Sequence, residues 1–153
     1  MSVQLRRSRF DELARVFELE RQPHAKPFVT PAPLARHQDD FSRDEVEYLS
    51  ILNESGALVG FFILTAEAGG QSVEFARIVV DAAERGIGQA AIAAMERFCA
   101  EELGANRIWL DVFDDNARGI HVYEKLGYRR FNSEPRGERT LHFYEKNIAA
   151  PWV

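Results

Sequence analysis

The stretch from Phe75 to Tyr128 constrains the fold more than any other part of this chain. It carries, in order, an apolar strand pattern, a glycine-containing loop, a long helical pattern, a second apolar strand pattern and a shorter helical pattern. This order predicts a βαβα unit. The glycine loop stands where the long helix begins, so free backbone N–H groups and the positive end of the helix dipole predict a site for an anion such as a phosphate.

The segments on either side of this unit predict the rest of a mixed sheet. Before it, alternation predicts an edge strand, an apolar stripe predicts a helix from Asp11 to near Gln22, and strand patterns joined by short turns form a meander. The predicted strands cover residues 3–9, 46–52, 58–66, 73–81, 107–113, 128–132 and 141–146, with a polar turn at 134–138. We therefore expect a single α/β domain over residues 1–153, in which a mixed central sheet of about six to seven strands carries helices on both faces.

Composition narrows the classes of function. The 153 residues suit one domain, and the apolar (46%) and charged (28%) fractions are ordinary for a globular protein. A net charge of −5 argues against general nucleic-acid affinity, and no apolar run approaches the ~20 residues of a membrane span. The single cysteine, Cys99, forms no intramolecular disulfide, and no Cys/His cluster has metal-binding spacing. We expect a cytoplasmic monomer or homodimer with no metal, nucleic-acid or membrane partner.

Taken alone, the glycine loop is ambiguous. Residues 86–91 satisfy the dinucleotide fingerprint G-x-G-x-x-G/A, and Asp111 lies 20 residues further on, where a ribose-binding acid is sought. However, the interval from Asp81 to Gly86 is too long for a tight Rossmann turn, and the 67 residues after Gly86 are too few for both nucleotide-binding halves. No Gly-Lys-Ser/Thr follows, which excludes a P-loop. A nucleotide-dependent oxidoreductase is therefore disfavoured, and a plain helix-start turn without a ligand remains an alternative.

Four motifs lie along the central stretch: Ile78-Val79-Val80-Asp81, Arg85-Gly86-Ile87-Gly88-Gln89-Ala90, Asp115-Asn116-Ala117-Arg118 and Val122-Tyr123-Glu124-Lys125-Leu126-Gly127-Tyr128. Together they resemble the GNAT superfamily of N-acetyltransferases. With Trp109-Leu110-Asp111-Val112 before them, the last two are similar to the Rim-type branch, which includes enzymes that acetylate protein N-termini. Resembling chains acetylate polyamines and aminoglycosides. The combination is specific, whereas the glycine loop alone is not.

The resemblance implies a GNAT-like fold and transfer of an acetyl group from acetyl-CoA to a primary amine by direct attack on the thioester. The acceptor would be a protein or peptide N-terminus, a polyamine or another small amine. The strand before the loop would lie along the pantetheine arm, and the loop amides would hold the pyrophosphate. The implied cofactor-binding residues are Ile78, Val79, Val80, Arg85, Gly86, Ile87, Gly88, Gln89, Ala90, Asn116 and Tyr123. Ala83 departs from the Gln or Arg usual at its position, but the backbone amides do not depend on that side chain.

The chemistry of acetyl transfer indicates catalytic candidates. The resemblance assigns protonation of the leaving thiolate to Tyr123, and an ordinary phenol pKa of ~10, above the ~8.5 of a thiol, keeps the needed proton at pH 7. Asp111 occupies the place of an acidic strand residue in the Rim-type branch, and Glu74 is the second candidate for the base that deprotonates the ammonium, directly or through water. Structural alternatives stay open: Tyr123 as a core residue, Asn116 as a helix N-cap, Asp111 paired with Arg77, and Glu74 as a solvated charge.

The sequence defines the binding site of the acceptor amine less well than that of the cofactor. The first helix, the proline-rich loop at 23–34 and the acids between Asp39 and Glu47 should border the acceptor groove, where acids would attract a cationic amine. The sequence does not choose the amine. The alternative function is an acyl-CoA-binding sensor or interaction module without catalysis, and the presence of both Asn116 and Tyr123 favours the enzyme.

Overall fold

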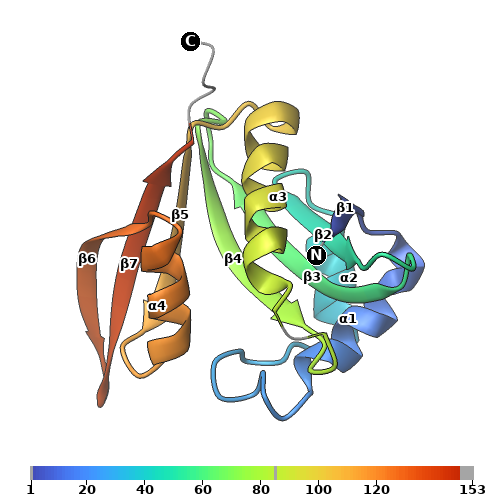
Figure 1. Cartoon of the computed structure of the whole chain (residues 1–153), viewed down its shortest axis with the longest axis horizontal. Helices are drawn as coiled ribbons and strands as arrows, with labels where there is room; N and C mark the ends of the chain where they lie inside the picture. Colours follow the sequence, from blue (N-terminus) through green and yellow to red (C-terminus); the bar gives the residue numbers. More distant parts are fainter. Residues whose placement is uncertain (1, 85, 149–153) are drawn as a thin grey trace.

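The computed structural model describes residues 2–84 and 86–148, which form one seven-stranded sheet with helices on both faces (Figure 1). Across the sheet the strand order is β1-β2-β3-β4-β5-β7-β6. The fold is therefore the predicted single-domain α/β fold with a mixed sheet. In chain order the elements are β1 (Gln4–Arg7), the 3₁₀ turn η1 (Phe10–Glu12), α1 (Leu13–Glu20), α2 (Leu34–Phe41), β2 (Val46–Leu52), β3 (Leu58–Ala66), β4 (Ser72–Val80), α3 (Gly88–Glu102), β5 (Arg107–Phe113), α4 (Ala117–Lys125), β6 (Arg129–Arg136) and β7 (Arg139–Asn147).

The junction between β4 and β5 differs from every other junction in the described sheet. Here the two strands run parallel, and they pair over only three residues each, the last pair being Glu74 with Trp109. Directly afterwards β4 carries an extra residue, Ala76, opposite β3, and such a β-bulge bends the strand that contains it. Beyond this point β4 and β5 diverge, which is visible in Figure 1 as a widening gap between the two strands. The backbone edge of β4 that faces β5 is consequently free of a strand partner from residue 76 to 80.

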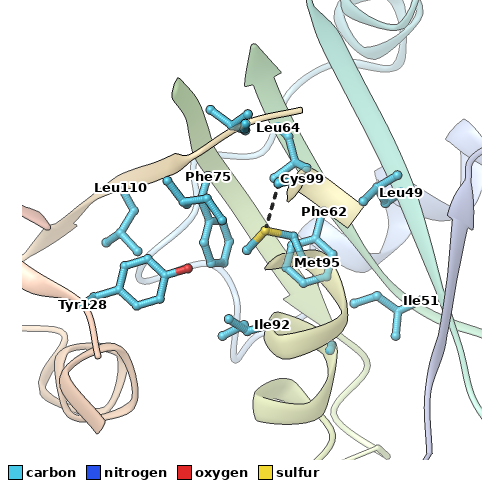
Figure 2. Packing of buried hydrophobic residues seen from close by; sticks show 14 of the residues in the cluster. Leu49, Ile51, Phe62, Leu64, Phe75, Ile92, Met95, Cys99, Leu110 and Tyr128 are labelled. Atoms are coloured by element: carbon cyan, nitrogen blue, oxygen red, sulfur yellow. Dashed lines mark hydrogen bonds between the residues drawn. The ribbon is translucent and has the colours of Figure 1, made fainter. Parts of the chain in front are cut away.

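Two apolar layers hold the helices against the sheet. Under α3 and α4 lies the larger cluster, in which Met95 and Cys99 of α3 pack among Phe62 and Phe75 of the sheet (Figure 2). The thiol of Cys99 is buried as expected. On the opposite face α1 and α2 cover a smaller cluster that includes Tyr48. Because both faces of the central strands β2 and β3 are covered, these strands are largely apolar on both sides.

Several predicted strand boundaries match the structure closely, and the prediction for one segment was wrong. The predicted strands at 46–52 and 58–66 are β2 and β3 without a shift. The polar turn predicted at 134–138 is instead mostly strand, because β6 continues through Pro135 to Arg136. Proline is tolerated there because β6 is the outer edge of the sheet, where one side of the backbone needs no partner. Over the described part of the chain, no helix is long and apolar enough to cross a membrane.

Candidate functional site

A cavity of about 720 Å³ fills the gap where β4 and β5 diverge. Its lining comes from both faces of the sheet, so it passes between the strands. On one face it is bordered by the start of α3 and by α4. On the other it is bordered by side chains of β4 and β5 and by the loop between α1 and α2. Residues of the first group are Gly86, Gly88, Gln89, Asn116, Val122 and Tyr123, and residues of the second are His24, Phe28, Val29, Thr30, Arg77, Asp111 and Phe113.

Two glycines of the loop, Gly86 and Gly88, line this cavity with backbone atoms. Gly86 has a φ of 91°, a left-handed conformation that favours glycine, and α3 begins two residues later at Gly88. Among the described residues no side chain caps the N-terminus of α3, and a Cβ placed on Gly88 would meet nothing within 4 Å. The helix start, with its unpaired N–H groups and positive dipole end, borders the cavity, which suits an anionic ligand.

The predicted cofactor-binding residues divide into two groups. Most of them line the cavity: Ile78, Val79, Val80, Gly86, Gly88, Gln89, Asn116 and Tyr123. The side chain of Ile87 is buried in the core below α3 instead, and Ala90 lies in the first turn of α3 outside the cavity lining. Backbone contacts by these two residues remain a prediction. Arg85 lies outside the described residues.

Asn116 is the N-cap of α4. Its Oδ1 accepts a hydrogen bond from the backbone N–H of Gly119 at 3.0 Å, and a Cβ on Gly119 would come within 2.7 Å of the Asn116 amide nitrogen. The N-cap interpretation is thus confirmed. Asn116 also lines the cavity, so its amide is positioned for a ligand contact as well.

Tyr123 lies on α4 with its ring in an aromatic cluster. The ring packs edge-on against Phe75, with centroids 5.9 Å apart, and against Tyr128 at 6.0 Å. Its hydroxyl makes no hydrogen bond to the described residues, although the side chain borders the cavity. Burial, with a smaller contribution from Asp111, raises the pKa of Tyr123 to about 12. The phenol is therefore a stable proton donor, free to pair with a bound group.

The two candidate bases differ in position. Asp111 lines the cavity, and its pKa is raised by burial, with a further increase from Glu134 that Arg136 opposes. Glu74 lies outside the cavity lining, in the paired part of β4, and burial together with the nearby Asp111 raises its pKa. The suggested pairing of Asp111 with Arg77 is absent from the described contacts, because Arg77 pairs with Glu20 instead.

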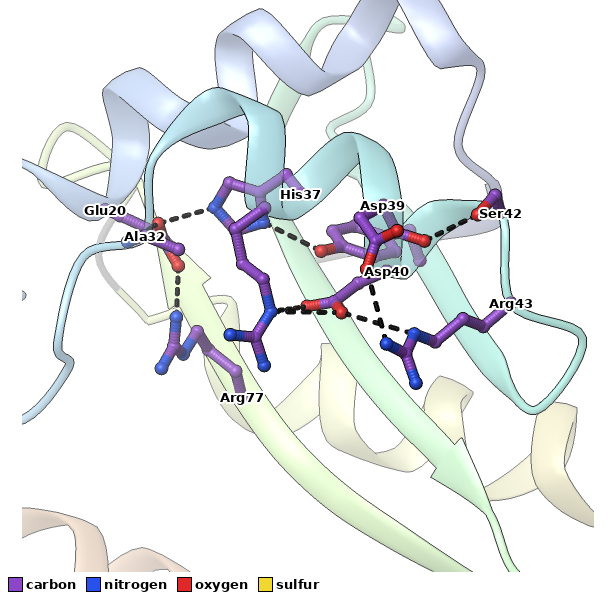
Figure 3. A network of polar contacts seen from close by, with 10 residues as sticks. Glu20, Ala32, His37, Asp39, Asp40, Ser42, Arg43 and Arg77 are labelled. Carbon is purple, nitrogen blue, oxygen red and sulfur yellow. Dashed lines mark hydrogen bonds and ion pairs between the residues drawn. The ribbon is translucent and has the colours of Figure 1, made fainter.

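The sequence did not reveal a buried polar network beside the cavity. The Glu20 side chain is 0% exposed and accepts hydrogen bonds from His37 Nε2 at 2.7 Å, from the Ala32 backbone N–H at 3.1 Å and from Arg77 Nη1 (Figure 3). Burial alone would raise the Glu20 pKa, but the hydrogen bonds from His37 and Ala32, together with the charge interactions that include Arg77, outweigh burial and lower that pKa. The network joins α1, α2, the loop between them and β4. Its one sequence signal is the position of Glu20 on the apolar side of α1, four residues after the buried Val16.

The site of this α/β protein is thus a cavity between two diverging strands, with the start of α3 at one side and Asp111 at the other. The chain belongs to the Acetyltransferase (GNAT) family, whose model matches residues 13–128. The predicted superfamily is therefore confirmed.

Solved structures share the fold across nearly the whole chain. A provisionally assigned phosphinothricin N-acetyltransferase superposes with a TM-score of 0.80 at 19% identity, covering 97% of this chain and 100% of the other. A Vibrio cholerae spermidine N-acetyltransferase in complex with CoA and spermine gives a TM-score of 0.82 at 15% identity, covering 96% of each chain. A comparison with curated protein sequences finds no match. At these identities the structural likeness establishes the fold alone.

Proposed function

We propose that this protein transfers the acetyl group of acetyl-CoA to a primary amine. The observation that carries the proposal is the cavity that passes between β4 and β5, because it connects an anion-suited helix start on one face with the carboxylate of Asp111 on the other. A thioester held from the first side and an amine held from the second would meet between the strands, next to Tyr123. Family membership supports the reaction type, and the CoA and spermine bound to the Vibrio cholerae relative support both ligand classes.

In this proposal the cofactor lies along the free edge of β4. The loop amides from Gly86 onward and the first turn of α3 hold the pyrophosphate, with Arg85, Gln89 and Ala90 as further contacts. Ile78, Val79 and Val80 line the cavity along this edge, and backbone groups there that point away from β3 contact the pantetheine arm. The Val80 carbonyl oxygen already bonds to His24 at 2.7 Å, so we assign stabilisation of the thioester oxyanion to a backbone N–H group of this strand. Asn116 contacts the pantetheine from the cap of α4.

The reaction is direct attack by the neutral amine on the thioester carbonyl. A carbon–nitrogen bond forms, the tetrahedral intermediate collapses, and the carbon–sulfur bond breaks. Tyr123 donates its phenolic proton to the departing thiolate and regains a proton from solvent. The proton lost by the amine passes to a carboxylate, for which Asp111 is the first candidate because it lines the cavity, with Glu74 acting through water as the second.

The pH dependence of kcat/KM tests the choice of base. Since the carboxyl pKa values of Asp111 and Glu74 are both raised, activity should fall with decreasing pH above the ordinary carboxyl range of ~4. Replacing the base by its amide should remove this acid limb and lower kcat/KM about 100-fold. We expect this for Asp111→Asn and a smaller effect for Glu74→Gln. An unchanged limb in both variants would exclude both carboxylates.

Thermal unfolding tests the cofactor assignment. We expect acetyl-CoA and CoA at saturating concentration to raise the melting temperature by several degrees, since a ligand at ~100 times its Kd adds ~2.7 kcal/mol to the stability. NAD should leave it unchanged. Equal stabilisation by NAD, or none by acetyl-CoA, would contradict the proposed ligand. The acceptor class, a cytoplasmic location and the choice between monomer and homodimer are further parts of the proposal.

A further inference from the structure

Arg77 places a partly free guanidinium group in the cavity. It lies on β4 beside the bulge, lines the cavity, and has a side chain that is 23% exposed. Its Nη1 donates to Glu20, and among residues 2–84 and 86–148 its Nε and Nη2 groups have no hydrogen-bond partner. A guanidinium has five N–H donors in a planar fork, so Arg77 retains donors that suit a second carboxylate.

The buried network fixes the position of this group. Glu20 is held by α1, by His37 of α2 and by the Ala32 backbone, and its pKa is lowered, so its carboxylate stays charged beside Arg77. Because several elements hold Glu20, the guanidinium has little freedom to lose when a ligand binds. If Arg77 served only in its structural ion pair with Glu20, its side chain would not need to border the cavity.

The carboxylates of Glu74 and Asp111, whose charge is opposite to that of Arg77, lie on the same face of the sheet as the Arg77 side chain. The neighbours of Glu74 and of Asp111 in sequence belong to the core below α3, so both acids point to the other face, toward which Arg77 also reaches to meet Glu20. Asp111 and Arg77 both line the cavity. This side of the cavity therefore contains a negative and a positive group.

We propose that the acceptor is an α-amino acid or a similar amine that carries an anionic group close to its reactive nitrogen, with Arg77 as the specificity-determining residue. The ammonium group pairs with Asp111 before it loses a proton, and the carboxylate binds the free donors of Arg77. A polyamine has no anionic group to pair with Arg77. One of its ammonium groups would come near the guanidinium, which carries the same charge. The inference rests on the proposed acetyl transfer, and it chooses one acceptor class within it.

The first test uses the unmodified protein. Each common L-amino acid is compared with its own carboxamide, which keeps the amine and the side chain but removes the negative charge, and spermidine is included. Acetyl-CoA consumption is measured, and the acetylated product is identified by mass. For the best acceptor we expect kcat/KM about 10- to 100-fold higher for the acid than for the amide, the loss typical of one charged hydrogen-bonding partner.

Variants then assign the preference to Arg77. Arg77→Gln should raise KM for the amino acid about 10- to 100-fold, change KM for its amide far less, and leave KM for acetyl-CoA unchanged. Arg77→Lys keeps the charge opposite Glu20 but lacks the planar fork, so it should recover stability with only part of the preference. Arg6→Gln is the matched control, because Arg6 likewise pairs with a nearly buried acid, Glu12, but lies outside the cavity lining. It should leave the preference intact.

The outcomes separate the two proposals. Consumption of acetyl-CoA with equal or higher kcat/KM for amides or spermidine would overturn the amino-acid acceptor and leave acetyl transfer standing. A preference that survives Arg77→Gln would overturn the role of Arg77. No consumption with any amine, together with no thermal stabilisation by acetyl-CoA, would overturn the proposed function and this inference with it.

Discussion

Replacing Tyr123 by phenylalanine should lower kcat by about 100-fold or more while leaving acetyl-CoA binding near normal. General acid catalysis contributes about 10²- to 10⁴-fold, and the substitution removes only the donor oxygen. The ring keeps its edge-on contacts with Phe75 and Tyr128, so the fold should be unaffected. The measurement is kcat under saturating substrates, together with the melting temperature with and without acetyl-CoA.

Tyr128→Phe is the matched control. Tyr128 belongs to the same aromatic cluster, but it is buried, lies outside the cavity lining, and its hydroxyl has no hydrogen-bond partner among the described residues. Loss of the Tyr128 hydroxyl group should therefore leave turnover unchanged. Equal turnover in wild type and Tyr123→Phe would assign Tyr123 to the core instead. The pKa of about 12 also predicts that the rate shows no basic limb from this phenol below pH 10.

The second large effect is on stability. Glu20→Ala should lower the free energy of unfolding by about 3–5 kcal/mol, because it leaves Arg77 and the buried His37 without their shared partner. Urea unfolding at pH 7 measures the change. Glu18→Ala on the same helix is the control, since Glu18 is exposed and should change stability by less than about 0.5 kcal/mol. A loss below about 1 kcal/mol for Glu20→Ala would contradict the structural role of the network.

Local patterns explain why much of the fold could be predicted. The strands β2 and β3 have strong apolar character and clear turns at their ends, so their bounds were found without a shift. The glycine loop, Asn116 and Tyr123 were recognised as motifs, and the cavity brings them together. The continuation of β6 through Pro135 was missed because only the position of β6 at the sheet edge makes that proline acceptable.

Contacts between distant segments could not be predicted in the same way. Glu20 and Arg77 lie 57 residues apart in sequence, and no local pattern links them. The sequence instead suggested Arg77 as a possible partner for Asp111, and the structure pairs it with Glu20. The divergence of β4 from β5 depends on a bulge at Ala76 that carries no sequence signal such as glycine. It is this divergence that creates the cavity.

We propose that this cavity catalyses acetyl transfer from acetyl-CoA to an amine. The most direct measurement is an acetyl-CoA consumption screen over free amino acids, polyamines and peptides with free N-termini, with each N-acetylated product confirmed by mass. We predict acceptor-dependent release of CoA in equal amount to the acetylated amine, reduced about 100-fold by Tyr123→Phe. Binding of acetyl-CoA without turnover of any amine would contradict the claim and would instead support an acyl-CoA-binding sensor.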